Sequence, residues 1–156
     1  MGAMKMQLQS IQTAQDANRT IIATHLASEL SEKMRSNHEQ MQQMNSNPFL
    51  KVNFQSDRTP PKTSATCFHT NCNSEQLANS DISEWLQQVT TSLPNARAVV
   101  CYDDFPWDSN VSSFKWECAS AGNHNNAIIK LGWGTRNNPG EKLPPRIVMA
   151  VTPSIN

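Results

Sequence analysis

The short stretch "CFHTNC" holds residue types that readily bind a metal, since Cys67, His69 and Cys72 fall within one small segment. Thiolates and imidazoles are the usual ligands of zinc in proteins. A structural zinc site needs a second ligand pair at a similar short spacing, and Cys101 and Cys118 are too far apart in the sequence to form one. A disulfide that closes a small loop explains the stretch better, so we expect no metal ion.

The four cysteines are even in number, which allows three pairings in an oxidising compartment. We predict the pairs Cys67–Cys72 and Cys101–Cys118. The second pair ends two segments with strand character, "RAVVCY" and "SFKWEC", and a hairpin between them would place the two thiols opposite each other. Paired cysteines also imply that the protein is exported from the cytosol.

The other residues that could do chemistry do not form a catalytic set. Asp103 and Asp104 are adjacent at a strand end, where neighbouring side chains point apart. The stretch "GWGTRNNPG" lacks the lysine and the following helix of a phosphate-binding loop. The histidines are scattered along the chain without a neighbouring nucleophile: His25, His38, His69 and His124. We therefore predict no catalytic residues, no cofactor and no enzyme activity.

The charge balance argues against a dedicated nucleic-acid binder. Lys and Arg together number 13, as do Asp and Glu, so the net charge is zero. Binding a phosphate backbone needs an excess of basic side chains on one surface. We expect no nucleic-acid partner, and the opposite hypothesis requires the following residues to cluster: Lys51, Arg58, Lys62, Arg97, Lys130, Arg136 and Lys142.

The segment before these cysteines has the pattern of one long helix. Residues 5–44 contain neither glycine nor proline, and apolar residues recur in steps of three and four. They are Leu8, Ile11, Ala14, Ile22, Leu26, Leu30 and Met34. A helix of this length exceeds what one compact domain requires, so we expect its N-terminal part to project. We interpret residues 1–4, "MGAM", as a cloning remnant.

Residues 45–156 have the pattern of a globular head. Prolines interrupt the segment up to residue 66, and we predict a second amphipathic helix over residues 73–93. Four segments rich in β-branched and aromatic residues follow within 97–152: "RAVVCY", "SFKWEC", "NAIIKLGW" and "RIVMAV". This order of elements predicts an α+β fold in which the long helix packs on an antiparallel sheet of about four strands.

Three of the tryptophans have contrasting surroundings in the sequence. Trp85 and Trp116 lie in amphipathic patterns, so we assign both to the core. Trp107 stands between Pro106 and Asp108 in a predicted loop. We therefore interpret Trp107 as an exposed contact for a protein partner.

Two blocks of the sequence resemble PilV-type minor pilins of type IV pili. The first, "LQSIQTAQDANRTIIATHLASELSEKMRSN", is rich in glutamine, then in alanine, and ends in the pattern formed by Ala23, Leu26, Ala27, Leu30, Met34, Arg35 and Asn37. The second is a cysteine pair followed by Gln76, Leu77, Ala78, Asp81, Trp85 and the "SLP" at Ser92–Pro94.

This resemblance implies a pilin fold in which the long helix is the C-terminal half of a spine. Two sets of residues then receive roles. Those expected to join the helix to the sheet are Leu26, Leu30, Met34, Trp85 and Trp116, and those expected to pack against neighbouring subunits are Leu8, Ile11, Ala14 and Ile22. The resemblance further implies an apolar segment and a leader peptide upstream of the present residues.

The resemblance also implies where such a protein works. Before assembly it would be anchored in the inner membrane of a Gram-negative bacterium with its head in the periplasm, and afterwards it would lie in the extracellular pilus. The implied partners are other minor pilins, the major pilin, a tip adhesin and the inner-membrane assembly platform. Two alternatives remain open: a minor pseudopilin of the type II secretion system, and a DNA-binding pilin for natural uptake. The residues present here are expected to form a soluble protein.

Overall fold

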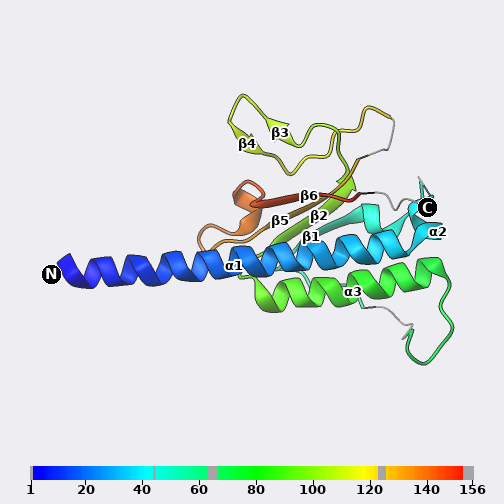
Figure 1. Cartoon of the computed structure of the whole chain (residues 1–156), viewed down its shortest axis with the longest axis horizontal. Coiled ribbons are helices and arrows are strands. Elements are labelled where there is room, and N and C mark those ends of the chain that lie inside the picture. Colours follow the sequence, from blue (N-terminus) through cyan, green and yellow to red (C-terminus); the bar gives the residue numbers. More distant parts are fainter. Residues whose placement is uncertain (1, 44, 63–66, 123–125, 153–156) are drawn as a thin grey trace.

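The computed structural model describes residues 2–43, 45–62, 67–122 and 126–152, with side chains from residue 7 onward. Helix α1 (Gly2–Ser36) runs along one face of a four-stranded sheet, and helix α3 (Ser74–Ser92) lies beside it. Figure 1 shows that the N-terminal part of α1 extends well past the rest of the chain, which forms a head. The arrangement is the predicted one, a long N-terminal helix on an antiparallel sheet in an α+β fold.

Helix α1 ends earlier than the predicted limit of residue 44. It stops at Ser36, and a separate single turn, α2 (His38–Met41), follows. Asn37 separates the two helices: its side-chain oxygen accepts a hydrogen bond from the backbone N–H of Gln40, and its amide nitrogen donates to the carbonyl of Ser74 at 2.8 Å. Asparagine caps helices readily, so these contacts end α1 and begin α2.

Helix α3 begins with a reciprocal capping box. The Asn73 side chain accepts from the backbone N–H of Gln76 at 2.8 Å, and the Gln76 side chain accepts from the backbone N–H of Asn73 at 3.0 Å. Two of the backbone donors that a helix start leaves unpaired are thereby satisfied. The helix ends at Ser92, two residues before Pro94, which lies close to the predicted range of 73–93.

The main sheet has the strand order β1-β2-β5-β6, and all neighbours are antiparallel. Its strands are β1 (Val52–Gln55), β2 (Arg97–Tyr102), β5 (Ala127–Gly132) and β6 (Ile147–Ala150). The segment "SFKWEC" is not one of them, contrary to the sequence-based expectation. Only Ser113–Phe114 of it forms a strand, β4, which pairs with β3 (Trp107–Asp108) in a separate hairpin.

Two short 3₁₀ turns complete the described elements, η1 (Pro48–Lys51) before β1 and η2 (Gly140–Lys142) before β6.

The backbone passes close to other backbone segments between the end of β5 and the start of η2. Gly134 in this connection and Gly140 at the start of η2 have no room for a side chain. A Cβ atom added to Gly134 would lie 1.9 Å from the carbonyl oxygen of Asn138, and one added to Gly140 would lie 2.9 Å from that of Asn95. Glycine at both positions lets the backbone segments approach closely.

The core lies between the two long helices and the sheet. Alternate residues of each strand point toward it, as Ala98 and Val100 of β2 and Ile129 and Leu131 of β5 do. The other strand residues point to the opposite side, which we call the far face. The hairpin β3–β4 lies on that side, away from α1 (Figure 1).

Candidate functional site

The first candidate surface is the part of α1 that precedes the head, residues 7–15, which we call the free stem. Every one of its side chains is exposed. Leu8 and Ile11 keep 58% and 55% of their surface accessible, a large fraction for two apolar residues on one helix, and Ala14 is exposed beside them. The free stem therefore carries an apolar stripe that no element in the described part of the chain covers.

Ile22, predicted to face neighbouring subunits, has a different position. It is partly buried and packs against the core of the head, four residues before the buried Leu26. Residues four apart share one side of a helix, which explains why Ile22 points inward. Its neighbour Ile21 is 57% exposed instead.

The junction of α1 with the head contains most of the residues assigned to it. Leu30 and Met34 are completely buried, and Leu26 nearly so. Trp85 of α3 is completely buried as well, and its indole N–H donates to the carbonyl oxygen of Leu26 at 2.8 Å. A buried tryptophan needs a partner for this N–H, and the contact ties α3 to α1.

Trp116 is buried, but it does not belong to the core between helix and sheet. It lies on the far face, where the guanidinium of Arg97 stacks on its ring at 4.8 Å from the centroid. Its indole N–H donates to the carbonyl of Leu143, and its ring covers Gly132. The assignment to the helix–sheet core was wrong because residues 115–118 leave the strand pattern and cross the far face.

The second candidate surface is residues 103–122, which we call the far-face loop. The Cys101–Cys118 disulfide fastens this loop to β2, and the Cα atoms of the two cysteines are 6.3 Å apart. The pairing is the predicted one, although its geometry differs: Cys101 lies opposite Ile128 of β5 in the ladder, and Cys118 lies in the loop itself.

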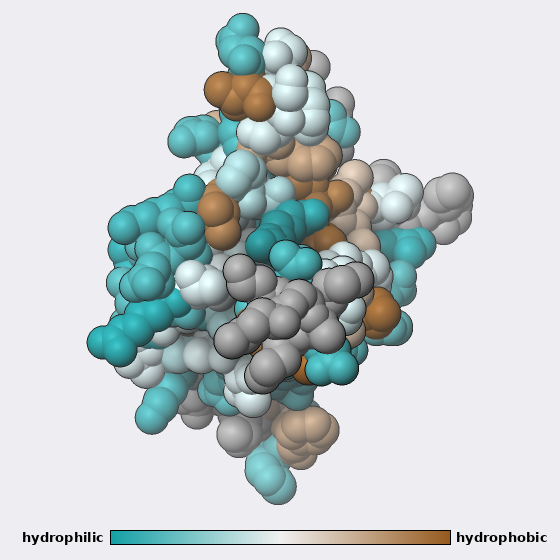
Figure 2. All heavy atoms as spheres, turned by 90° about the vertical axis from the view of Figure 1, so that its left-hand side faces the viewer, coloured by the Kyte–Doolittle hydropathy of each residue, from teal (hydrophilic) through white to brown (hydrophobic). Residues whose placement is uncertain are grey.

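Apolar side chains project from the far-face loop. Trp107 is 50% exposed, and its ring meets the ring of Phe114 edge-on, with centroids 5.1 Å apart. Phe105 and Val111 are more exposed still. Figure 2 looks along α1 from its free end and shows hydrophobic residues at the top, where the hairpin projects.

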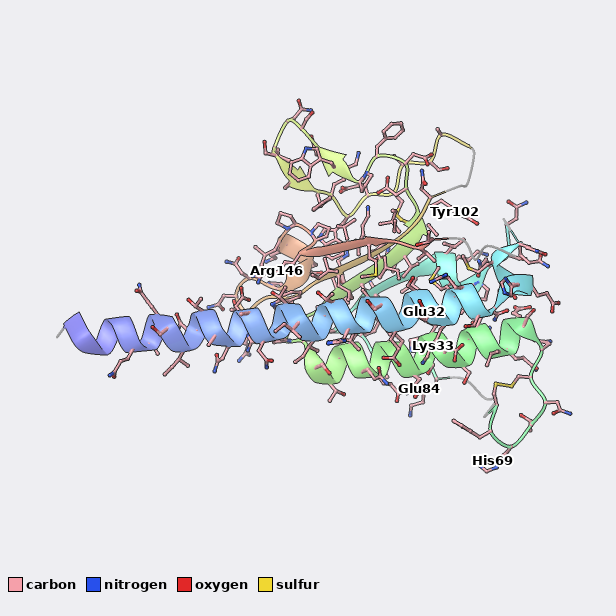
Figure 3. The ribbon with its side chains drawn as sticks, in the orientation of Figure 1. Glu32, Lys33, His69, Glu84, Tyr102 and Arg146 are labelled. Carbon is pink, nitrogen blue, oxygen red and sulfur yellow. A yellow bond between two sulfur atoms is a disulfide. The ribbon has the colours of Figure 1, made fainter. Side chains whose placement is uncertain are left out.

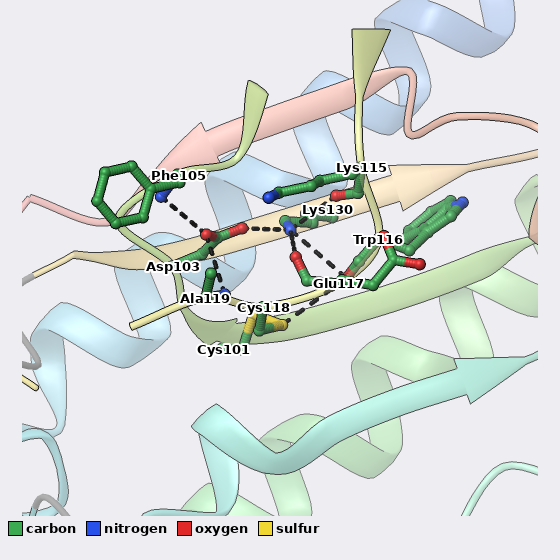
Figure 4. Close-up of polar contacts among 9 residues, drawn as sticks. All are labelled: Cys101, Asp103, Phe105, Lys115, Trp116, Glu117, Cys118, Ala119 and Lys130. Carbon is green, nitrogen blue, oxygen red and sulfur yellow. Dashed lines mark hydrogen bonds and ion pairs between the residues drawn. A yellow bond between two sulfur atoms is a disulfide. The ribbon is translucent and has the colours of Figure 1, made fainter. Parts of the chain in front are cut away.

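Lys130, in the middle of β5, is completely buried beneath the far-face loop. Its ammonium group contacts a carboxylate oxygen of Asp103 at 2.5 Å. It also donates to the backbone carbonyls of Lys115 at 2.8 Å and Glu117 at 3.0 Å (Figure 4). The charge is thus both paired and fully hydrogen-bonded, which is the condition for burying an ammonium group.

Asp103 completes this arrangement from the other side. It is 1% exposed, and its second carboxylate oxygen accepts hydrogen bonds from the backbone N–H groups of Phe105 and Ala119. One buried ion pair therefore orients the start and the end of the far-face loop. Because Lys130 is buried, it cannot contribute to a surface that binds DNA.

The Cys67–Cys72 disulfide closes the small loop that first suggested a metal site. The loop lies at the end of the head opposite to the free stem, where Figure 3 labels His69. Phe68 beside it is 95% exposed. Among the described residues, no three His, Cys, Asp or Glu side chains are grouped as metal ligands.

A polar cluster marks the point where α1 leaves the head. One carboxylate oxygen of Asp16 accepts a hydrogen bond from the Arg146 guanidinium at 2.6 Å and another from the Trp133 indole N–H at 3.2 Å. The guanidinium of Arg146 also stacks on the Trp133 ring, 4.8 Å from its centroid. We call these three residues the stem clasp.

The protonation of Asp16 reflects this environment. Desolvation alone would raise the pKa of its carboxyl group, but the hydrogen bonds from Trp133 and Arg146 and the positive charges of Arg146 and Arg19 outweigh that effect. The pKa of Asp16 consequently lies below its ordinary value, and the carboxylate is ionised at neutral pH.

None of the described helices combines the length and the hydropathy that crossing a membrane requires.

The fold is that of the pilin class of filament subunits. In this class a long helix packs on an antiparallel sheet, and here the helix also projects from the head with an apolar stripe exposed. A family model described as Tt1218-like, type IV pilin Tt1218, matches residues 5–83, and the chain belongs to this family of type IV pilins. Proteins of this class are structural, non-enzymatic subunits of pili. Comparison with curated proteins and with solved structures gave no match.

Proposed function

We propose that this protein is a minor pilin of the PilV type, which enters the type IV pilus with other minor pilins at or near its tip and takes part in starting pilus assembly. The observation that carries the proposal is the free stem, whose apolar residues have no partner element in the described part of the chain. In a filament, helices of neighbouring subunits would cover this stripe and bury its apolar surface.

The two candidate surfaces suit two different kinds of contact. The free stem would pack against the stems of other minor pilins and of the major pilin. Trp107, half-exposed on the far-face loop, would contact a further protein, such as a tip adhesin or the inner-membrane assembly platform. Tryptophan is enriched among the residues that dominate binding energy at protein interfaces.

The proposal can be tested in cells that make the protein with its natural upstream segment. Leu8→Glu combined with Ile11→Glu would place charges on the free stem, so we expect the variant to be absent from sheared pili and the number of pili to fall. The head should fold normally, because both side chains are exposed and lie outside the core. Normal piliation with the variant present in the pili would contradict the proposed role.

A matched control is Leu77→Glu, which changes an exposed leucine of α3 on the head. This variant should enter pili as the unchanged protein does.

The contact proposed for Trp107 is tested separately. Trp107→Ala should also enter pili, but fewer of the other tip components should be recovered together with these pili. If the recovery of the other tip components is unchanged, Trp107 is not a partner contact.

Deletion of the protein and a DNA-binding assay separate the two alternatives. A type II pseudopilin would leave pilus number unchanged when deleted, but it would block secretion of folded proteins. A DNA-binding pilin would bind DNA in a salt-dependent way at low ionic strength. Its basic surface would have to form without Lys130, which is completely buried.

A further inference from the structure

Burial along α1 falls off in steps toward its free end. Leu30 and Ala23 are completely buried, Ile22, Arg19 and Asp16 are partly buried, and every described side chain before Asp16 is exposed. Asp16 is therefore the partly buried residue of α1 nearest to the free end, and its carboxylate is hydrogen-bonded to the head. Any force that lifts the free stem from the head reaches the stem clasp before it reaches the apolar contacts.

The stem clasp connects α1 to two paired strands of the sheet, the inner strand β5 and the edge strand β6. Trp133 directly follows β5, and Arg146 directly precedes β6, so the two partners of Asp16 sit at adjacent ends of paired strands. Trp133 is 1% exposed, and its stacking with Arg146 holds the guanidinium over a fixed ring. A load on Asp16 is thus passed to two hydrogen-bonded strands at once.

The chemistry of the clasp differs from that of the contacts behind it. Apolar contacts between Leu30 or Ala27 and the sheet have no preferred direction, whereas a carboxylate that accepts from a guanidinium and an indole depends steeply on distance and angle. A small displacement is enough to break the hydrogen bonds of the clasp. The clasp therefore resists the first step of separation and contributes little after that step.

We propose that the Asp16–Arg146–Trp133 clasp has a mechanical function: it keeps α1 from peeling off the sheet when the stem and the head are pulled apart. For its biological meaning, this inference rests on the proposed function, in which neighbouring subunits hold the stem while the head contacts other proteins. The clasp itself is a property of the isolated chain and can be tested without a pilus.

The test is a single-molecule pulling experiment on the whole chain. Handles are attached at the exposed Gln7 on the free stem and at the exposed Gln87 on α3, so that the load separates α1 from the head. The quantity measured is the rate of the first opening event at a constant force. Asp16→Asn should raise this rate roughly fivefold or more, as expected when an ion pair and a charge-assisted hydrogen bond are weakened.

The matched control is Asp57→Asn, the same chemical change at an exposed aspartate in the turn after β1, which should leave the opening rate unchanged. Arg146→Gln should raise the rate as Asp16→Asn does. The double variant should show little more than either single one, because both remove the same contact.

An Asp16→Asn chain that opens at the rate of the unchanged protein would overturn the proposal, as would fully additive effects of the two single variants. These outcomes would leave the pilin proposal untouched. Conversely, failure of the Leu8 and Ile11 variants to alter piliation would refute the proposed role without bearing on the opening rate.

Discussion

Lys130 shows how one charged residue can organise a loop. A buried ammonium group is costly to desolvate, and here the cost is offset by Asp103 and by the backbone carbonyls of the far-face loop. A well-packed apolar pair at these two positions could stabilise the fold about as much as the ion pair does. Its distinctive contribution is orientation, since Lys130 and Asp103 together contact the backbone of five loop residues: Phe105, Lys115, Trp116, Glu117 and Ala119.

Lys130→Met should destabilise the protein by about 3–5 kcal/mol, because it leaves the Asp103 carboxylate buried without its counter-charge. The double variant Lys130→Met with Asp103→Leu should recover only part of that loss, because it removes the unpaired charge but leaves backbone groups of the far-face loop without their hydrogen-bond partners. Denaturation in urea, followed by tryptophan fluorescence, measures both values. If the single variant is as stable as the unchanged protein, the ion pair does not hold the loop.

The pH dependence of stability provides a test of Asp16. Its pKa is lower in the folded protein than in the unfolded chain, so the carboxylate contributes stability above its ordinary pKa and loses it as the pH falls through the lowered folded-state value. Asp16→Asn should therefore be less stable than the unchanged protein at pH 7. The difference should shrink as the pH falls below the ordinary pKa of an aspartate and through the lowered folded-state pKa, and a difference that stays constant as the pH falls would contradict the assignment.

At the scale of elements, α1 behaves as two different helices in one. Its C-terminal half is held by the core, whereas every side chain of the free stem is exposed. Leu30→Ala should thus cost about 2–5 kcal/mol of unfolding free energy, and Leu8→Ala should cost almost nothing. Thermal unfolding of the two variants compares the same substitution in both halves, and equal losses would contradict this division.

The two disulfides also differ as elements. Cys67–Cys72 closes a loop with a sequence separation of 5, and Cys101–Cys118 closes one of 17. The loop-entropy model gives about 2 kcal/mol for the first and about 3 kcal/mol for the second. Replacing each pair by serine and measuring denaturation should reproduce that order, and a larger loss for the shorter loop would point to other contacts.

Local patterns predicted most of these elements, and long-range contacts caused the differences. The spacing of apolar residues and Pro94 located α3, and β-branched runs located β2, β5 and β6. The break after Ser36 depends on a hydrogen bond from Asn37 to Ser74, far along the chain. The strand pattern of "SFKWEC" is abandoned because Lys130 binds its backbone carbonyls, which no local pattern reveals.

At the scale of the whole molecule, the candidate surfaces face in different directions. The free stem continues the line of α1, while the far-face loop lies across the sheet from it (Figure 1). A subunit whose stem is covered by its neighbours would therefore still present Trp107 on another side. The two surfaces can be occupied at the same time.

Amide hydrogen exchange should show a gradient along the molecule. An isolated helical segment is marginal in water, so amides of residues 2–15 should exchange quickly although they are helical. Amides of residues 23–36, which pack on the sheet, should exchange many times more slowly. Uniform slow exchange over the whole of α1 would contradict the division of this helix into a packed half and a free stem.

The sequence predicted the free stem and the disulfide pairs but not the clasp or the buried ion pair. Leu8 and Ile11 repeat at helical spacing beyond what the head needs, which a local pattern reveals. Asp16 and Arg146 are separated by 130 residues, and each looks like an ordinary surface charge in isolation. A lysine in the middle of the apolar run "AIIKLG" was the available signal for Lys130, because a central strand rarely buries a charge without a partner.

The tight passage at Gly134 and Gly140 affects how sequence variation in relatives should be interpreted. Any other residue at Gly134 would drive the backbone away from Asn138 and displace the adjoining Trp133. Both positions would therefore remain glycine in every descendant that keeps this connection, even if its binding partners changed completely. Their invariance would reflect backbone crowding, and a search for recognition residues based on unchanging positions should set them aside.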